Sequence, residues 1–270
     1  MSYKSIFVNI DIDCTAVAPI VGYAAALARD FDAHLTGSCG ADIPLPVVAA
    51  DGIGAYDGET MAIERKEIEA RHKELEAEFA KALSGVAVKS QWQASVFDPT
   101  QFLVDTARAA DLIVTANPKG GHFRAIDIGN LALGAGRPIL VAADGADRLS
   151  TERALIAWKD TREARRAISD SLPLLRRTRE IVVATVEPDP DSYVSSSLND
   201  IVRFLKFHDI TARAEQITGQ GEDISNAVRS FKADFVVAGA YGHSRLREWI
   251  FGGVTRSLIG DTGLNRFLSN

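Results

Sequence analysis

Residues 110–116 read ADLIVTA and residues 233–239 read ADFVVAG, so the same apolar strand with an Ala-Asp start occurs twice, 123 positions apart. Gly129 and Gly252 follow at the same separation. The segments KSIFVNIDID (4–13) and ALIAWKD (154–160) form a second pair, which places Asp11 over Lys159. That pair is 148 positions apart, so the first copy carries an insertion of about 25 residues. We interpret the chain as a duplicated unit, although any two α/β segments share some alternation of strands and helices.

The expected elements alternate in the same order in both copies. In the first copy, strands are expected at 6–10, 33–37, 86–94, 112–115 and 138–142, and helices at 16–31, 59–83 and 99–109. In the second, strands are expected at 154–158, 181–186, 211–217, 234–238 and 265–268. Helices are expected at 163–175, 198–208 and 223–232, and one more after a glycine-rich loop. This alternation predicts parallel sheets covered on both faces. The predicted domains are residues 1–145 and 152–270, with a polar boundary between them.

The composition excludes several classes of protein. The 270 residues carry a net charge of −6, which gives no support to broad binding of DNA or RNA. The two cysteines, Cys14 and Cys39, form no CxxC pair and no zinc-like cluster with histidine. Asp11 and Asp13 interrupt the N-terminus too early for a signal peptide, and no apolar run is long enough to span a membrane. We therefore expect a cytoplasmic protein.

Residues 239–255, GAYGHSRLREWIFGGVT, carry the strongest functional signal. Their glycines follow the spacing Gly-x2-Gly-x9-Gly, directly after an expected strand. In open parallel sheets, ligands bind beyond the carboxyl ends of the strands. Glycines let backbone amides approach phosphate oxygens, and a helix that starts near Gly253 would direct its amides at the same anion. The loop is neither a Walker A motif nor a GxGxxG motif.

This loop resembles the nucleotide motif of the universal stress proteins, Gly-x2-Gly-x9-Gly-Ser/Thr, and the resemblance extends over nearly the whole chain as two domains in tandem. It implies two open five-stranded parallel sheets of strand order 3-2-1-4-5 with helices on both faces, a fold of the adenine-nucleotide alpha-hydrolase type. It also implies ATP, with or without magnesium, as the ligand. The phosphate contacts that the resemblance implies are Gly239, Gly242, Gly252, Gly253 and Thr255; His243, Arg245 and Val254 of the same loop are also predicted nucleotide-site residues. The implied contacts near the adenosine are Ala157 and Val186, while Lys159 is predicted to neutralise phosphate or to fill or close the site.

The two copies depart from this motif to different degrees. In the second copy, Gly253 replaces the usual Ser/Thr, and Lys159 replaces the usual acidic residue at the end of the first strand. Lys159 either contacts the ligand or forms a surface salt bridge. In the first, Asp11 keeps the acidic position, but Ala116 and Lys119 replace two loop glycines. Side chains at these positions should weaken a phosphate cradle. We therefore expect nucleotide to bind the second copy only.

These features favour a stress-response protein that senses or regulates through a bound adenine nucleotide. The alternative is a nucleotide-free interaction module with a vestigial site. A third hypothesis, a slow ATPase, is disfavoured because no catalytic base is identifiable. Asp11 and Asp13 suggest a pair of metal ligands, but two acidic residues at the end of a strand are more often solvated. We therefore expect no metal site. The inserted segment 40–59 is a lid, a protein contact or a loop folded on its own domain. By the same resemblance, the halves pair through their last strands as a pseudo-dimer, and a homodimer of chains can follow.

Overall fold

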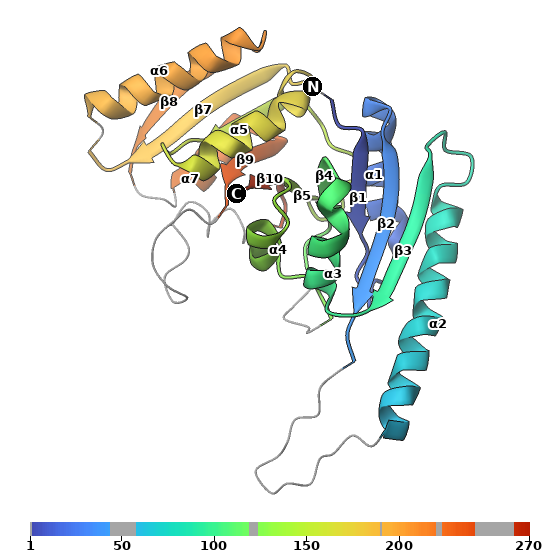
Figure 1. Ribbon diagram of the computed structural model, residues 1–270. Helices are drawn as coiled ribbons and strands as arrows, with labels where there is room; N and C mark the ends of the chain where they lie inside the picture. The colour runs from blue at the N-terminus through green and yellow to red at the C-terminus, as the bar shows by residue number, and fades with distance from the viewer. Residues whose placement is uncertain (1, 44–57, 119–123, 190, 220–222, 241–261) are drawn as a thin grey trace, which may run out of the picture.

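The computed structural model (Figure 1) describes residues 2–43, 58–118, 124–189, 191–219, 223–240 and 262–270. The first half contains β1 (Ser5–Asn9), α1 (Val17–Phe31), β2 (His34–Ala41), α2 (Gly58–Ala82), β3 (Ser90–Val96), α3 (Pro99–Thr106), a 3-10 turn (Ala107–Ala109), β4 (Leu112–Thr115), α4 (Ile128–Gly134) and β5 (Ile139–Val141). The second half contains β6 (Arg153–Ala157), α5 (Arg162–Leu175), β7 (Glu180–Glu187), α6 (Ser192–Phe207), β8 (Arg213–Thr218), α7 (Asp223–Phe231), β9 (Phe235–Gly239) and β10 (Asn265–Ser269).

All of these strands belong to one sheet of ten, in the order β3-β2-β1-β4-β5-β10-β9-β6-β7-β8. Within the first half the pairing is parallel and the order is 3-2-1-4-5, as expected. The second half has the same order when it is read from the opposite edge of the sheet. The two expected last strands lie side by side: β5 and β10 pair antiparallel, with Phe267 opposite Leu140.

Helices cover both faces of this sheet, because successive strand residues point to opposite sides. On β6, Ala154 and Ile156 pack into a buried cluster that also holds residues of α1, α2, α5 and α6. Leu155 and Ala157 pack into a second cluster, with residues of α3, α4 and α7. Each cluster draws residues from both halves, so a continuous apolar layer lies on each side of the sheet.

Three element boundaries differ clearly from the expectation, and α4 was not expected at all. The strand expected at 33–37 continues to Ala41 as β2. The strand expected at 86–94 begins only at Ser90, because Val86 and Val88 are held in turns by the bonds Val86 N to Leu83 O and Val88 N to Val86 O. The helix expected at 198–208 begins at Ser192. The Asp191 side chain caps that helix by accepting a 2.9 Å hydrogen bond from the Val194 amide, which starts it before its apolar stripe.

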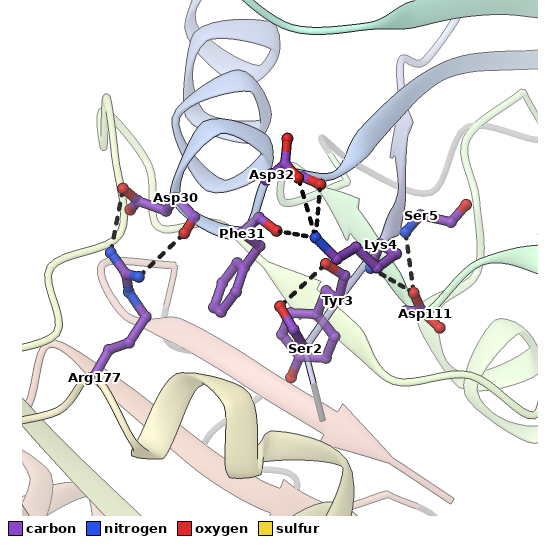
Figure 2. Close-up of polar contacts among 9 residues, drawn as sticks. All are labelled: Ser2, Tyr3, Lys4, Ser5, Asp30, Phe31, Asp32, Asp111 and Arg177. Carbon is purple, nitrogen blue, oxygen red and sulfur yellow. Dashed lines mark hydrogen bonds and ion pairs between the residues drawn. The ribbon is translucent and has the colours of Figure 1, made fainter.

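Side chains near the carboxyl-terminal ends of α1 and α5 join the two halves, as Figure 2 shows for Arg177 and Asp30. Arg177 lies 3.3 Å from the Asp30 carboxylate, and its guanidinium lies over the Phe31 ring, 5.3 Å from the centroid. The Tyr3 hydroxyl donates a 2.6 Å hydrogen bond to the Asp170 carbonyl, and its ring packs edge-on against Phe31. These contacts hold the end of α1 to α5. None of the helices within the described ranges has the length and apolar character that a bilayer crossing requires.

Candidate functional site

The predicted site lies where the chain reverses its direction of travel across the sheet. From β6 the chain proceeds outward to β7 and β8, then returns to β9 on the other side of β6. Ala157 at the end of β6 lies opposite Ala238 of β9, so the two carboxyl ends meet at one edge. Such a switch point is where open α/β sheets bind ligands. The next residue of β9 is Gly239, the first glycine of the predicted loop.

Ala157 and Val186 come together as the sequence predicts. Both pack on the face of the sheet that α7 covers, Ala157 buried and Val186 half-buried. Gly239 faces the opposite side. A Cβ built there would lie 2.5 Å from the Ala164 amide nitrogen and 2.7 Å from the Glu163 carbonyl carbon. The glycine is thus required for the close approach of α5, independently of any phosphate.

Lys159 lies just beyond the end of β6, with its side chain 76% exposed. Its ammonium is 3.7 Å from the Glu187 carboxylate at the end of β7. At this exposure the pair contributes little to stability. The lysine therefore forms the salt bridge considered in the sequence analysis, at the same edge of the sheet as the predicted ligand.

Two acidic residues next to Lys159 were not predicted to matter. Asp160 accepts hydrogen bonds of 2.5 Å from the Tyr193 hydroxyl and from Arg165, and these bonds lower its pKa. Glu163 is only 3% exposed, with its backbone against Gly239, and its Oε1 accepts no hydrogen bond from the part of the chain that the structure describes, although Arg162 Nε lies 3.3 Å away. A carboxylate in the first turn of α5 suits the helix dipole. The sequence signal for this carboxylate was the position of Glu163 in the first turn of α5, two residues after the N-cap Thr161.

The other residues of the predicted loop, Gly242, His243, Arg245, Gly252, Gly253, Val254 and Thr255, lie outside the described residues. So do Lys119 of the first half and most of the inserted segment 40–59. The site residues that the structure does place are therefore Ala157, Lys159, Val186 and Gly239, all of them at one edge of β6, β7 and β9.

The equivalent edge of the first half holds a cavity of about 350 Å³ at the carboxyl ends of β1 and β4. Asp11 and Asp13 line it. Both residues lie beyond the end of β1 at Asn9, in a turn in which the Cys14 amide bonds to the Asp11 carbonyl at 2.9 Å. Burial raises the pKa of Asp11. The described residues include no group of three or more side chains suited to a metal ion.

A buried polar network connects this cavity to β10 of the other half. Asn117 lines the cavity and donates hydrogen bonds to the Ala142 carbonyl at 3.2 Å and to the Asp144 carboxylate at 3.1 Å. Arg266, which is 1% exposed, donates a hydrogen bond to Oδ1 of Asn117. Sequence reasoning missed both residues, because a lone arginine in a short strand and a loop asparagine form no motif.

Comparison with solved structures shows the same fold in other proteins. A universal stress protein from Archaeoglobus fulgidus superimposes with a TM-score of 0.75 at 13% identity, over 98% of this chain and 96% of that one. A putative universal stress protein from Pseudomonas aeruginosa gives 0.64 at 14% identity, over 99% and 93%. A functionally unknown protein, also from Pseudomonas aeruginosa, gives 0.59 at 12% identity, over 99% and 92%. No protein-family model matches the sequence, and no curated protein matches it significantly.

The chain therefore shares, along nearly its whole length, the α/β fold of universal stress proteins, with its parallel-dominated sheet and flanking helices. At such low sequence identities the likeness concerns the fold.

Proposed function

We propose that this chain is a stress-response protein of the universal stress protein type that binds ATP, or a related adenine nucleotide, in its second half. It acts as a sensor or regulator rather than as a metabolic enzyme. The observation that carries this proposal is the meeting of β6 and β9, which puts Ala157 beside Ala238 and starts the Gly-x2-Gly-x9-Gly segment at the switch point of the sheet.

The chemistry of this edge suits a nucleotide. At this edge the half-buried Val186, next to the buried Ala157, offers an apolar contact of the kind that an adenine ring packs against. The loop supplies glycines for phosphate, together with His243, Arg245 and Arg247 as local positive charge in an acidic chain. The exposed ammonium of Lys159, at the same edge of the sheet, would exchange its partner Glu187 for a phosphate group. Magnesium, where present, would accompany the phosphates.

The antiparallel pairing of β5 with β10 supports a further part of the proposal, that the two halves form an intramolecular pseudo-dimer. We also propose that two chains form a homodimer and that the protein is cytoplasmic. The proposed domains remain residues 1–145 and 152–270, one on each side of this seam.

A labelled ATP analogue tests the site by equilibrium binding to the full chain. Gly242→Val and Gly252→Val should abolish binding, because a branched side chain blocks the approach of the backbone to phosphate. Gly22→Val is the matched control, since Gly22 is exposed on α1 and a Cβ there meets nothing within 4 Å. Tight binding that survives both loop substitutions would refute the proposal.

A nucleotide-free interaction module is the second candidate. Glu163 favours it, because this buried acidic residue has its backbone against Gly239 and a carboxylate near this edge would repel phosphate. So does Lys159, which already has a carboxylate partner. ATP or ADP found bound at near one per chain in gently purified protein would exclude this candidate. Turnover of more than a few ATP per second would instead identify an enzyme.

A further inference from the structure

The first-half cavity has a shape and lining that suit a small organic ligand. Its volume of about 350 Å³ falls within the usual range for ligand pockets. Ile10, Pro19, Ile20 and Ala146 give it apolar walls, which favour an aliphatic body. The cavity is built by the ends of β1 and β4, the start of α1 and the segment after β5, at one edge of the sheet.

The charge of the lining is negative. Asp11, Asp13 and Asp144 line the cavity, and Arg124 is the one basic side chain among its described lining residues. Arg124 forms a 2.9 Å ion pair with Glu64 of α2, so its charge is balanced within the protein. Arg71 of α2 approaches the same turn, where it donates to the Cys14 carbonyl at 2.7 Å, but Glu74 and Glu78 each lie 3.0 Å from it.

The part of the first half that corresponds to a phosphate cradle is already occupied by a carboxylate. Gly129 and Asn130 correspond to Gly252 and Gly253 of the second half, and they lie in the first turn of α4. Oδ1 of Asp127 accepts a 2.7 Å hydrogen bond from the Asn130 amide, which caps the helix. An incoming phosphate would have to displace this cap and would meet the repulsion of Asp11 and Asp13.

We propose that the first-half cavity binds an organic cation, an aliphatic amine or guanidine, whose charged head lies between Asp11 and Asp13 and whose carbon chain lies against Ile10 and Ile20. A carboxylate binds an ammonium or a guanidinium through charge-assisted hydrogen bonds. Asp11 accepts a 2.9 Å hydrogen bond from Asn9 at Oδ1 and another from the Ile126 backbone, and an ionised carboxylate has about four acceptor sites, so it can accept further hydrogen bonds from a ligand. An organic cation fits better than a metal ion, because the described residues hold no metal-binding group and the walls are apolar.

The two copies of the unit would thus have diverged in ligand chemistry. At equivalent positions, the first copy has Asp11 where the second has Lys159, and Ala116 where the second has Gly239. The edge of the first half has an acidic cavity, while the sequence of the second half adds the glycine-rich loop and its basic residues. This inference does not depend on ATP binding in the second half.

Isothermal titration of the full chain with four compounds of equal chain length tests the proposal: hexylamine, hexylguanidine, hexanol and hexanoate. We expect one saturable site for each of the two cations, at least about tenfold tighter than for hexanol, and no binding of hexanoate. Asp11→Asn combined with Asp13→Asn should weaken hexylamine by at least about tenfold. Asp105→Asn, at an exposed aspartate of α3 on the opposite face of the sheet, should leave its affinity unchanged.

Three results would overturn the proposal. The first is no saturable binding of either cation at millimolar concentration. The second is an unchanged affinity for hexylamine in the Asp11/Asp13 double variant, once circular dichroism has established that the variant is folded. The third is competition between ATP and hexylamine for the same site, which would assign the cavity to nucleotide. Loss of ATP binding in the Gly252→Val variant has no bearing on these outcomes, so the two proposals can fail separately.

Discussion

The Tyr23 hydroxyl of α1 donates a 2.8 Å hydrogen bond to Oδ1 of Asn265, the first residue of β10. Oδ1 of Asn265 also accepts from the Ala143 amide at 3.0 Å, and Nδ2 donates to the Asp234 carbonyl at 2.9 Å. One buried amide therefore holds a helix of the first half, the segment after β5 and the start of β9. The seam between the halves is fixed by side chains as well as by the β5–β10 ladder.

Tyr23→Phe should lower the free energy of unfolding by about 1 kcal/mol, because it removes one buried hydrogen bond and leaves the packing of the ring intact. Urea denaturation measures this change. Tyr193→Phe is the control: Tyr193 is 62% exposed and bonds to Asp160 at the surface, so its loss should have a much smaller effect. Equal effects of the two substitutions would contradict the role given to the Tyr23–Asn265 bond.

Arg266→Met should lower the free energy of unfolding by about 2 kcal/mol. Methionine fills most of the space, but Asn117 loses the charged donor to its Oδ1 in a buried position. The same substitution at Arg213, whose side chain is 59% exposed, should change stability little. If the Arg266→Met variant proved as stable as the Arg213→Met variant, the network at the seam would not support the fold.

Gly239→Ala should destabilise the protein by about 1–3 kcal/mol even without ligand, because the new Cβ would meet backbone atoms of Glu163 and Ala164. Gly22→Ala, in open space on α1, should be neutral or slightly stabilising. Thermal melts of both variants in the absence of nucleotide compare them. An unchanged melting temperature for Gly239→Ala would mean that α5 does not need this close approach.

The titration of Asp11 should make stability depend on pH. Burial, and secondarily the charge of Asp13, raise the pKa of Asp11, against hydrogen bonds from Asn9 and the Ile126 amide that lower it. The folded state then holds this proton more tightly than the unfolded state, whose pKa is about 3.9. Ionisation therefore costs stability above the folded pKa, and this cost disappears as the pH falls from the folded pKa toward the unfolded one.

Asp11→Asn should accordingly be more stable than the natural protein near neutral pH, and the difference should shrink as the pH approaches about 4. Urea denaturation at several pH values measures it. A difference that stays constant over this range, or that grows as the pH falls, would contradict the raised pKa.

Much of the fold could be predicted because its strands are short apolar runs such as Leu112–Thr115, and the repeat of one such run predicted two halves with the same strand order. Errors arose where local signals competed. Val86 and Val88 continue the alternation of β3 but lie in turns, and the polar residues at the start of α6 concealed a helix that Asp191 caps. Predicting these boundaries required knowing which backbone amides find partners.

The site was predictable to a lesser degree. Ala157 and Val186 could be placed at one edge, because parallel strands bring their carboxyl ends together. The packing of Gly239 on α5 could not be predicted, because it depends on the distance between two elements far apart in sequence. The first-half cavity was missed for the same reason: Asp11, Arg124 and Asp144 come from separate segments, and no spacing connects them.

Native mass spectrometry of the full chain titrated with ATP tests the central claim most directly, because it counts bound nucleotides. The account predicts a single adenine nucleotide per chain, absent in Gly252→Val and retained in the Asp11→Asn, Asp13→Asn double variant. Two nucleotides per chain, or a single one that persists in Gly252→Val and is lost in the double variant, would contradict it.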